Sequence, residues 1–154
     1  MSQVSRVVSK LFDDVDFPLQ EFTYRLIMIL KTLTKGKLYT LYALDLNERC
    51  FVVEFLSDLD KQSEKQIFAL FKHIGASGPP VNEEKFKHLE GKIYELKTRT
   101  GALILSFFGR GQSLVLTHGF FKPSQRKLKI EISKAAEWEK VYQQSLKIQN
   151  KEKR

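Results

Sequence analysis

Residues 89–122 constrain the fold more tightly than any other segment of this chain. From residue 93 to residue 99, apolar and charged side chains alternate with a period of two, which is typical of a strand buried on one side only. The buried side would carry Tyr94 and Leu96, and the open side Glu95, Lys97 and Arg99. The strand therefore offers two cations in a row on its open face.

Two further strands are predicted directly after it, over Ala102–Phe108 and Ser113–His118. The four residues between them, Gly109–Gln112, include two glycines and are few enough to form a hairpin. The last strand ends on its histidine, and Lys122 follows after a glycine and two phenylalanines. A basic sheet face with a histidine at one strand end is suited to handling phosphate without a metal.

In the first third of the chain, the sequence pattern predicts two helices and two strands. A short helix over residues 1–12 would end at the break from Asp13 to Pro18. A second helix would end at Lys35–Gly36. Its apolar residues recur at helical spacing: Phe22, Leu26, Ile29, Leu30 and Leu33. Strands are predicted over Leu38–Leu44 and Phe51–Phe55, with a turn between them.

The remaining segments predict three helices around the sheet. One starts near Ser57, Asp58 and Asp60, whose oxygens suit a helix start, and ends between Gly75 and Pro80. A short basic helix would carry Lys85 and Lys87. A long final helix, capped by Ser124, would bury Leu128, Ile132, Ala135 and Tyr142. Hairpin-joined strands outnumber crossover helices, so an α+β fold with a largely antiparallel sheet is predicted.

Charge is the main signal in the composition. Lys and Arg number 26 against 18 Asp and Glu, giving a net charge of +8, which attracts polyanions but does not separate RNA from DNA or from an acidic protein. One cysteine, Cys50, excludes an intramolecular disulfide, and three scattered histidines do not indicate zinc, so no metal or cofactor is predicted.

No membrane span is predicted. The longest apolar run, Leu26–Leu30, is too short to cross a bilayer, and the first residues lack the apolar core of a signal peptide. We therefore expect a cytoplasmic protein.

The order of these motifs resembles the RelE/HigB superfamily of toxins from toxin–antitoxin pairs, in particular its phage-derived, HigB-like branch. The resemblance rests on a helix, a Gly-Pro-Pro loop, Lys-x-Leu-Glu-Gly, Tyr-Glu-Leu-Lys-x-Arg, a hairpin, His-Gly-Phe-x-Lys and a basic helix, and covers roughly residues 51–142. It implies a small curved sheet with helices packed on one face. We expect residues 46–154 to form this domain and residues 1–45 to be an extension packed on it.

The resemblance also implies an activity. RelE-like toxins bind in the decoding site of the ribosome and cut messenger RNA, by attack of a ribose 2′-hydroxyl on its own 3′ phosphate. The reaction needs a base, an acid and cations on the phosphate. The residues that match the family's catalytic positions are Lys97, Arg99, His118 and Lys122. Those expected to bind RNA are Lys85, Lys87, Arg110, Arg126, Lys127 and Lys129.

One departure from the family leaves open whether the chain is an enzyme. The family carries an arginine early in the strand that here runs from Ala102 to Phe108, around Ile104, and this chain has none. Arg110 on the hairpin is a possible replacement. The expected partners are an antitoxin with a helix-turn-helix, the ribosome and messenger RNA. The alternative is a non-catalytic protein of the same fold that inhibits gyrase, as the ParE branch does, or that only binds nucleic acid.

Overall fold

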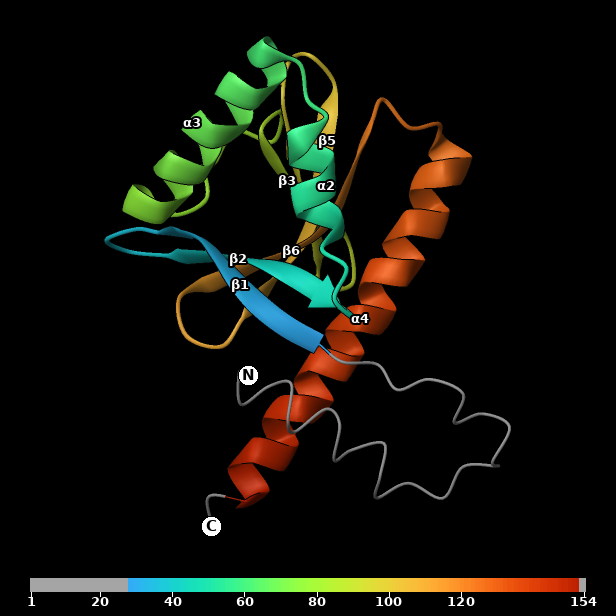
Figure 1. Ribbon diagram of the computed structural model, residues 1–154. Coiled ribbons are helices and arrows are strands. Elements are labelled where there is room, and N and C mark those ends of the chain that lie inside the picture. Colours follow the sequence, from blue (N-terminus) through green and yellow to red (C-terminus); the bar gives the residue numbers. More distant parts are fainter. Residues whose placement is uncertain (1–27, 153–154) are drawn as a thin grey trace.

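The computed structural model describes residues 28–152 (Figure 1). A six-stranded sheet forms its centre, in the order β1-β2-β6-β5-β4-β3. The strands are β1 (Met28–Lys35), β2 (Thr40–Leu46), β3 (Phe86–Glu90), β4 (Ile93–Lys97), β5 (Ala102–Gly109) and β6 (Ser113–Phe121). The helices are α2 (Phe51–Ser57), α3 (Lys61–Ser77) and α4 (Gln125–Glu152).

The sheet is mixed but mostly antiparallel. Four of its five strand pairs are antiparallel, and only β2 runs parallel to its neighbour β6. The hairpin predicted between the strands at residues 102–108 and 113–118 is confirmed, because β5 and β6 pair from Gly109↔Ser113 to Ala102↔Phe121. The predicted α+β class is therefore confirmed.

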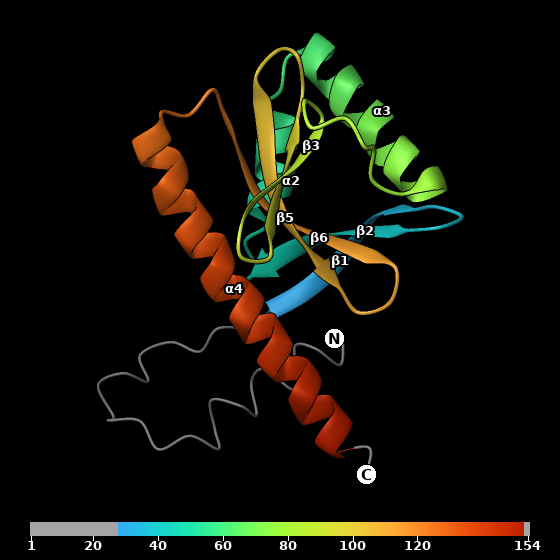
Figure 2. The same ribbon diagram turned by 180° about the vertical axis from the view of Figure 1, so that it is seen from behind.

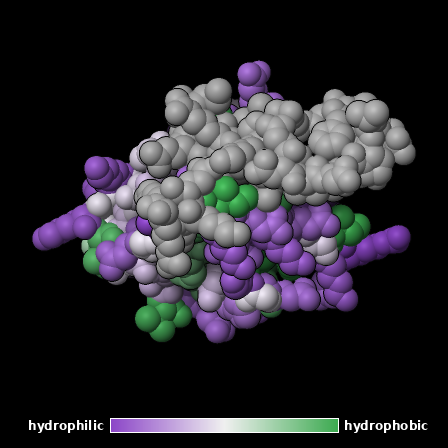
Figure 3. Space-filling model, turned by 90° about the horizontal axis from the view of Figure 1, so that it is seen from below, coloured by the Kyte–Doolittle hydropathy of each residue, from purple (hydrophilic) through white to green (hydrophobic). Residues whose placement is uncertain are grey.

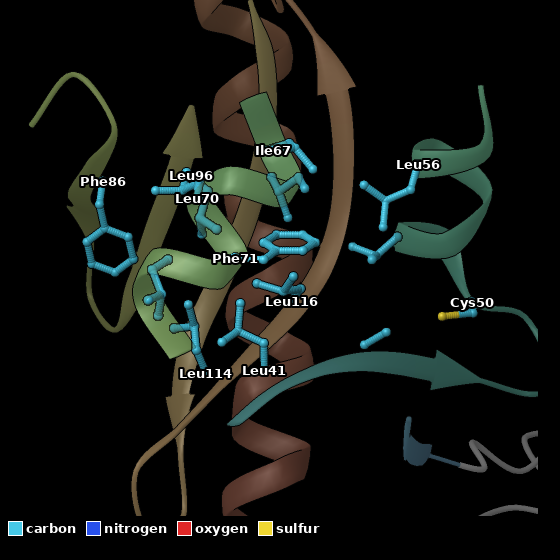
Figure 4. Close-up of a cluster of buried hydrophobic side chains, with 14 residues drawn as sticks. Leu41, Cys50, Leu56, Ile67, Leu70, Phe71, Phe86, Leu96, Leu114 and Leu116 are labelled. Atoms are coloured by element: carbon cyan, nitrogen blue, oxygen red, sulfur yellow. The ribbon is translucent and has the colours of Figure 1, made fainter. Parts of the chain in front are cut away.

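Helices cover both faces of the sheet, where one covered face was expected (Figure 1). Along β5, Ile104 belongs to the core under α2 and α3, whereas Leu103 and Leu105 belong to the core under α4. Because successive strand residues point to opposite faces, these two cores lie on opposite sides of the sheet. Figure 4 shows the first core, in which Phe71 of α3 lies among Ile67, Leu70 and Leu116.

The helix predicted through Leu33 is wrong over the part that the structure describes, because residues 28–35 form β1. This segment pairs along its length with β2, from Met28↔Leu46 to Lys35↔Thr40. Its apolar residues fit a helical period, but its two threonines favour a strand and backbone pairing decides the outcome. The predicted strand at residues 38–44 is confirmed as β2.

The strand predicted over residues 51–55 is also wrong, because this segment forms α2. Val52 and Leu56, four residues apart, are its buried residues, which is helical spacing. Arg49 supports the first turn through hydrogen bonds to the Glu54 carboxylate, the two shortest at 3.0 and 3.1 Å. The short basic helix predicted around Lys85 and Lys87 is likewise wrong, since residues 86–90 form β3.

Both long helices begin where the sequence predicted. The Asp60 carboxylate accepts a hydrogen bond from the Ser63 N–H at 3.1 Å, which caps α3. The Ser124 hydroxyl accepts one from the Lys127 N–H at 3.1 Å, which caps α4. The predicted burial of Ile132, Ala135 and Tyr142 is confirmed.

Several predictions for the first residues lie outside the described part of the chain, including the helix over residues 1–12 and the break after it. Within the described part, β1 and β2 join the sheet through β6. Seen from below, the surface of this part is mainly hydrophilic with separate hydrophobic spots (Figure 3). None of the helices over residues 28–152 is long and apolar enough to cross a membrane.

Candidate nucleic-acid interface

At one end of the sheet, β4 and β6 finish beside the start of β5. Lys97, the last residue of β4, is paired with Leu103 near the start of β5, and Leu103 is paired with Phe120 near the end of β6. Residues paired in this way share a face, so the Lys97 side chain lies on the α4 side of the sheet. It is exposed there.

Arg99 is not on the strand but in the turn that follows it. The Gly101 N–H donates to the carbonyl of Thr98, which closes a four-residue turn. The Thr98 hydroxyl accepts from the Ala102 N–H at 3.0 Å, and the Arg99 N–H donates to the side-chain oxygen of Gln66 on α3 at 3.0 Å. Both ends of the turn are thus fixed, while the guanidinium is exposed. The expectation that Arg99 continues the strand is wrong.

Lys122 lies across the same turn. Its backbone N–H donates to the Gly101 carbonyl at 2.9 Å, and its aliphatic stem covers the position where a Gly101 side chain would start. The Lys122 ammonium is 5.9 Å from the centre of the Phe121 ring. Lys122 also has a positive φ of 41°, a conformation that non-glycine residues seldom adopt. The loop after β6 therefore delivers this cation to the turn that holds Arg99.

The first turn of α4 adds a fourth cation. The Lys127 ammonium is 5.9 Å from the centre of the Phe120 ring, which lies beside Leu103. Lys97, Arg99, Lys122 and Lys127 thus come from four separate segments and gather at one end of the sheet. We call this set the basic end. Arg126 and Lys129 are exposed on the same first turns of α4 and extend its positive charge.

The other predicted RNA-binding residues are spread more widely. Arg110 lies in the β5–β6 hairpin, at the far end of the eight-residue strand β5, so it is roughly 25 Å from the basic end. It does not replace the missing strand arginine. Lys87 on β3 is paired with Glu95, and Lys85 comes just before β3 beside the Arg99 turn.

His118 is buried between the sheet and α4. Its Nε2 is 2.8 Å from the Glu131 carboxylate, and its Nδ1 is 2.9 Å from the Thr117 hydroxyl. Burial lowers the pKa of His118 below its ordinary value, against the opposing effect of Glu131. The ring can donate from Nε2 to Glu131, while Nδ1 faces the Thr117 hydroxyl, which itself donates to the Leu105 carbonyl at 3.1 Å. Both nitrogens are then engaged inside the protein, which favours a structural role for this histidine.

Close packing against α2 explains why a glycine, Gly119, follows His118. A side-chain carbon at Gly119 would collide with the ring of Phe55 on α2. On the other face, the His118 ring meets Trp138 of α4 edge-on, with ring centres 5.1 Å apart. The His-Gly-Phe segment of the sequence thus joins β6 to a helix on each side.

A family model described as phage-derived protein Gp49-like (DUF891) matches residues 54–140, more than half of the chain. The chain belongs to this family. Gp49-like proteins are a RelE-like toxin family of toxin–antitoxin systems, so the predicted toxin superfamily is confirmed. The narrower HigB-like branch stays a prediction. A search of curated proteins found no match.

Within the Gp49-like region, Glu95 is a residue whose importance the sequence did not reveal. Strand alternation placed it on an open face, but it is only 7% exposed. Burial raises the pKa of Glu95, although Lys97 and Lys87 act in the opposite direction. It lies in the same sheet row as Leu105 and His118 and two residues before Lys97. A carboxyl group with a raised pKa beside cations is a candidate for proton transfer.

In this Gp49-like protein, apolar residues occupy the start of β5, where an arginine was expected from the resemblance. Leu103, between Lys97 and Phe120, is 5% exposed and packs in the core under α4. Ile104 is fully buried on the opposite face. The basic end therefore surrounds an apolar strand start. Across residues 28–152, no group of three His, Cys, Asp or Glu side chains is placed to hold a metal ion.

Proposed function

We propose that this protein is the toxin of a toxin–antitoxin pair that inhibits translation by cutting messenger RNA on the ribosome. The toxin role follows from the family, and the observation that carries the cleavage mechanism is the basic end. Four cations from four segments gather there beside a partly exposed aromatic residue, Phe121. Such a surface is suited to a phosphodiester with a base next to it.

The proposed reaction is attack of a ribose 2′-oxygen on the adjacent phosphorus. The bond to the 5′-oxygen of the next nucleotide breaks, which leaves a 2′,3′-cyclic phosphate and a free 5′-hydroxyl. Arg99 would hold two phosphate oxygens through its planar guanidinium, and Lys97 and Lys122 would offset the charge that builds up on them. This chemistry needs no metal or cofactor from the protein.

Two protons must move during this reaction, one from the 2′-hydroxyl and one to the leaving 5′-oxygen. For the first transfer we propose Glu95, because it lies two residues before Lys97 on the same face of β4 and burial raises its pKa. The ammonium of Lys97 or Lys122 can supply the second proton. His118 matches a catalytic position of the family, but its engaged nitrogens favour a positioning role, in which it fixes α4 through Glu131.

The toxin family implies an antitoxin partner. We propose that this antitoxin carries a helix-turn-helix and that the other partners are the ribosome and messenger RNA. The cytoplasm, where translating ribosomes are found, is the proposed location.

The test compares two arginine variants. Expression of the unmodified chain should arrest growth, and its transcripts should be cut only when ribosomes are present. Arg99→Ala should slow cleavage about a hundredfold, or cost about 3 kcal/mol, as loss of one group that stabilises the transition state does. Arg110→Ala, an exposed arginine at the far end of β5, is the matched control and should cut at the parental rate. Equal cleavage rates for the parent, Arg99→Ala and Arg110→Ala would show that Arg99 does not take part in cleavage.

A second candidate function is favoured by the apolar residues at Leu103 and Ile104. Without the strand arginine, the same fold can act as a non-catalytic inhibitor of a large target such as gyrase, or as a nucleic-acid-binding protein. Growth arrest with intact transcripts and damaged DNA would support the gyrase inhibitor. Absence of any arrest would support the binding protein.

A further inference from the structure

A groove of about 760 Å³ lies on the α3 side of the sheet, next to the basic end. One wall is α3, and the other is formed by the segment between α3 and β3 together with the end of β4. Figure 2 shows this segment returning beside α3. The volume falls within the range of small-ligand pockets, about 300–1,000 Å³.

The lining of this groove combines an apolar part with cations. Ala69, Leu70 and Pro80 supply the apolar part, and the exposed imidazole of His73 lies among them. Lys85, Lys97 and Arg99 are its cationic residues, against one carboxylate, Glu84. An apolar surface with an aromatic ring suits the face of a nucleobase, and the cations suit a phosphate.

Two side-chain amides in the lining are held in defined orientations. The Gln66 oxygen accepts from the Arg99 N–H at 3.0 Å, and the Asn82 oxygen accepts from the Glu84 N–H at 2.9 Å. With each oxygen engaged by a backbone N–H, the amide NH₂ groups are the donors that these two lining residues can offer to a ligand. Nucleobases present acceptors on their edges that such donors can bind.

We propose that this groove binds a nucleotide of single-stranded RNA next to the phosphate held at the basic end. Arg99 and Lys97 border both places, so one strand can pass from the α4 side around the end of the sheet into the groove. An acidic peptide would use the cations but would leave the apolar part and the oriented amides with less to bind. The inference rests on the proposed function for its choice of RNA.

The test fills the groove without changing charge. Ala69 is an exposed α3 residue in the lining, and Ala76 is an exposed α3 residue outside it. Ala69→Trp and Ala76→Trp therefore make a matched pair, with the same substitution on the same helix. The probe is a fluorescent 2′-O-methyl hexanucleotide of adenylate and uridylate, which cannot be cut because the attacking hydroxyl is blocked. Binding is measured by fluorescence anisotropy with the full chain, and circular dichroism checks folding.

Ala69→Trp should weaken binding about tenfold or more, the effect of losing one stacked base, whereas Ala76→Trp should bind as the parent does. Lys85→Ala should lower the dependence of log Kd on log salt concentration by about one unit. Equal affinities of Ala69→Trp and Ala76→Trp for the hexanucleotide would overturn the proposal that the groove binds RNA. Tighter binding of a poly-glutamate peptide, lost in Ala69→Trp, would also overturn it and assign the groove to an acidic polypeptide.

Ribosome-dependent cleavage separates this inference from the proposed function. If the parent cuts messenger RNA and Ala69→Trp cuts equally well with unchanged binding, the groove proposal fails and the function stands. If the hexanucleotide binds in the groove but no messenger RNA is cut, the cleavage function fails and the groove stands.

Discussion

Gly36, in the hairpin between β1 and β2, packs directly against Gly75 near the end of α3, and this contact supports a quantitative prediction. A side-chain carbon built at Gly36 would overlap the backbone of Gly75. The Gly75 carbonyl accepts hydrogen bonds from the N–H groups of Leu38 and Tyr39, at 2.8 and 3.0 Å. Gly36→Ala must therefore move the hairpin away from the helix.

The expected cost has two parts. Overpacking in a well-packed region costs about 1–3 kcal/mol. Loss of one of the two hydrogen bonds to Gly75 adds about 0.5–1.5 kcal/mol. Gly36→Ala should thus lower the free energy of unfolding by about 1.5–4.5 kcal/mol, a large part of the stability of an ordinary domain, which is about 5–15 kcal/mol.

The same substitution at the other glycine, Gly75→Ala, should have a much smaller effect on the free energy of unfolding. A side-chain carbon at Gly75 would lie 3.1 Å from the Gly36 Cα, a tight contact but not an overlap. Alanine also gains about 0.5–1 kcal/mol over glycine inside a helix. Gly75→Ala should therefore stay within about 1 kcal/mol of the parent.

Urea unfolding followed by circular dichroism measures both changes, with Lys37→Ala, an exposed residue of the same hairpin, as control. The order of stability should be parent, Lys37→Ala and Gly75→Ala together, then Gly36→Ala well below. An unfolding midpoint for Gly36→Ala equal to that of Lys37→Ala would refute the close packing of hairpin and helix.

Two further predictions concern buried side chains. Because the pKa of folded His118 is below its ordinary value of 6.5, the unfolded chain takes up a proton first as the pH falls, so stability should drop below about pH 6.5, by at most about 1.4 kcal/mol per pH unit. His118→Gln should flatten this dependence in urea unfolding between pH 7.5 and 5.5, and an unchanged slope would contradict the burial effect. Phe71→Ala should cost about 3–5 kcal/mol, because the ring is 1% exposed in the core under α2 and α3. The exposed Phe68 on the same helix is its control, and similar unfolding midpoints for Phe68→Ala and Phe71→Ala would count against this core.

The sequence predicted best where a long periodic segment or a cap is present. The strands β4 to β6 and the helices α3 and α4 were all predicted, the helices with capping residues that the structure confirms at Asp60 and Ser124. The errors fall on shorter segments, namely β1, α2 and β3, which have five to eight residues each. In such segments, periods of two and of three to four residues cannot be told apart, and pairing with distant strands decides the conformation.

The candidate site shows a similar limit. The sequence singled out the cations of the basic end through the resemblance to the toxin family, and the structure brings them to one end of the sheet, while their role on RNA stays a prediction. It did not predict that α4 would cover Glu95, or that Glu131 would engage His118, since both depend on how a helix crosses the sheet. Arg110 looked near in sequence but lies a full strand length away.

The parallel contact between β2 and β6 has a consequence for the limits of the folding unit. Residues 54–140 alone would contain β3 to β6 but not β2. The backbone of β6 from residue 113 to residue 116 would then lose its neighbour and present unpaired N–H and C=O groups to solvent. Open strand edges of this kind promote association between chains. The β1–β2 hairpin thus covers this edge of β6, and a shortened protein that omits it would be exposed to aggregation through β6 even with every residue of the basic end in place.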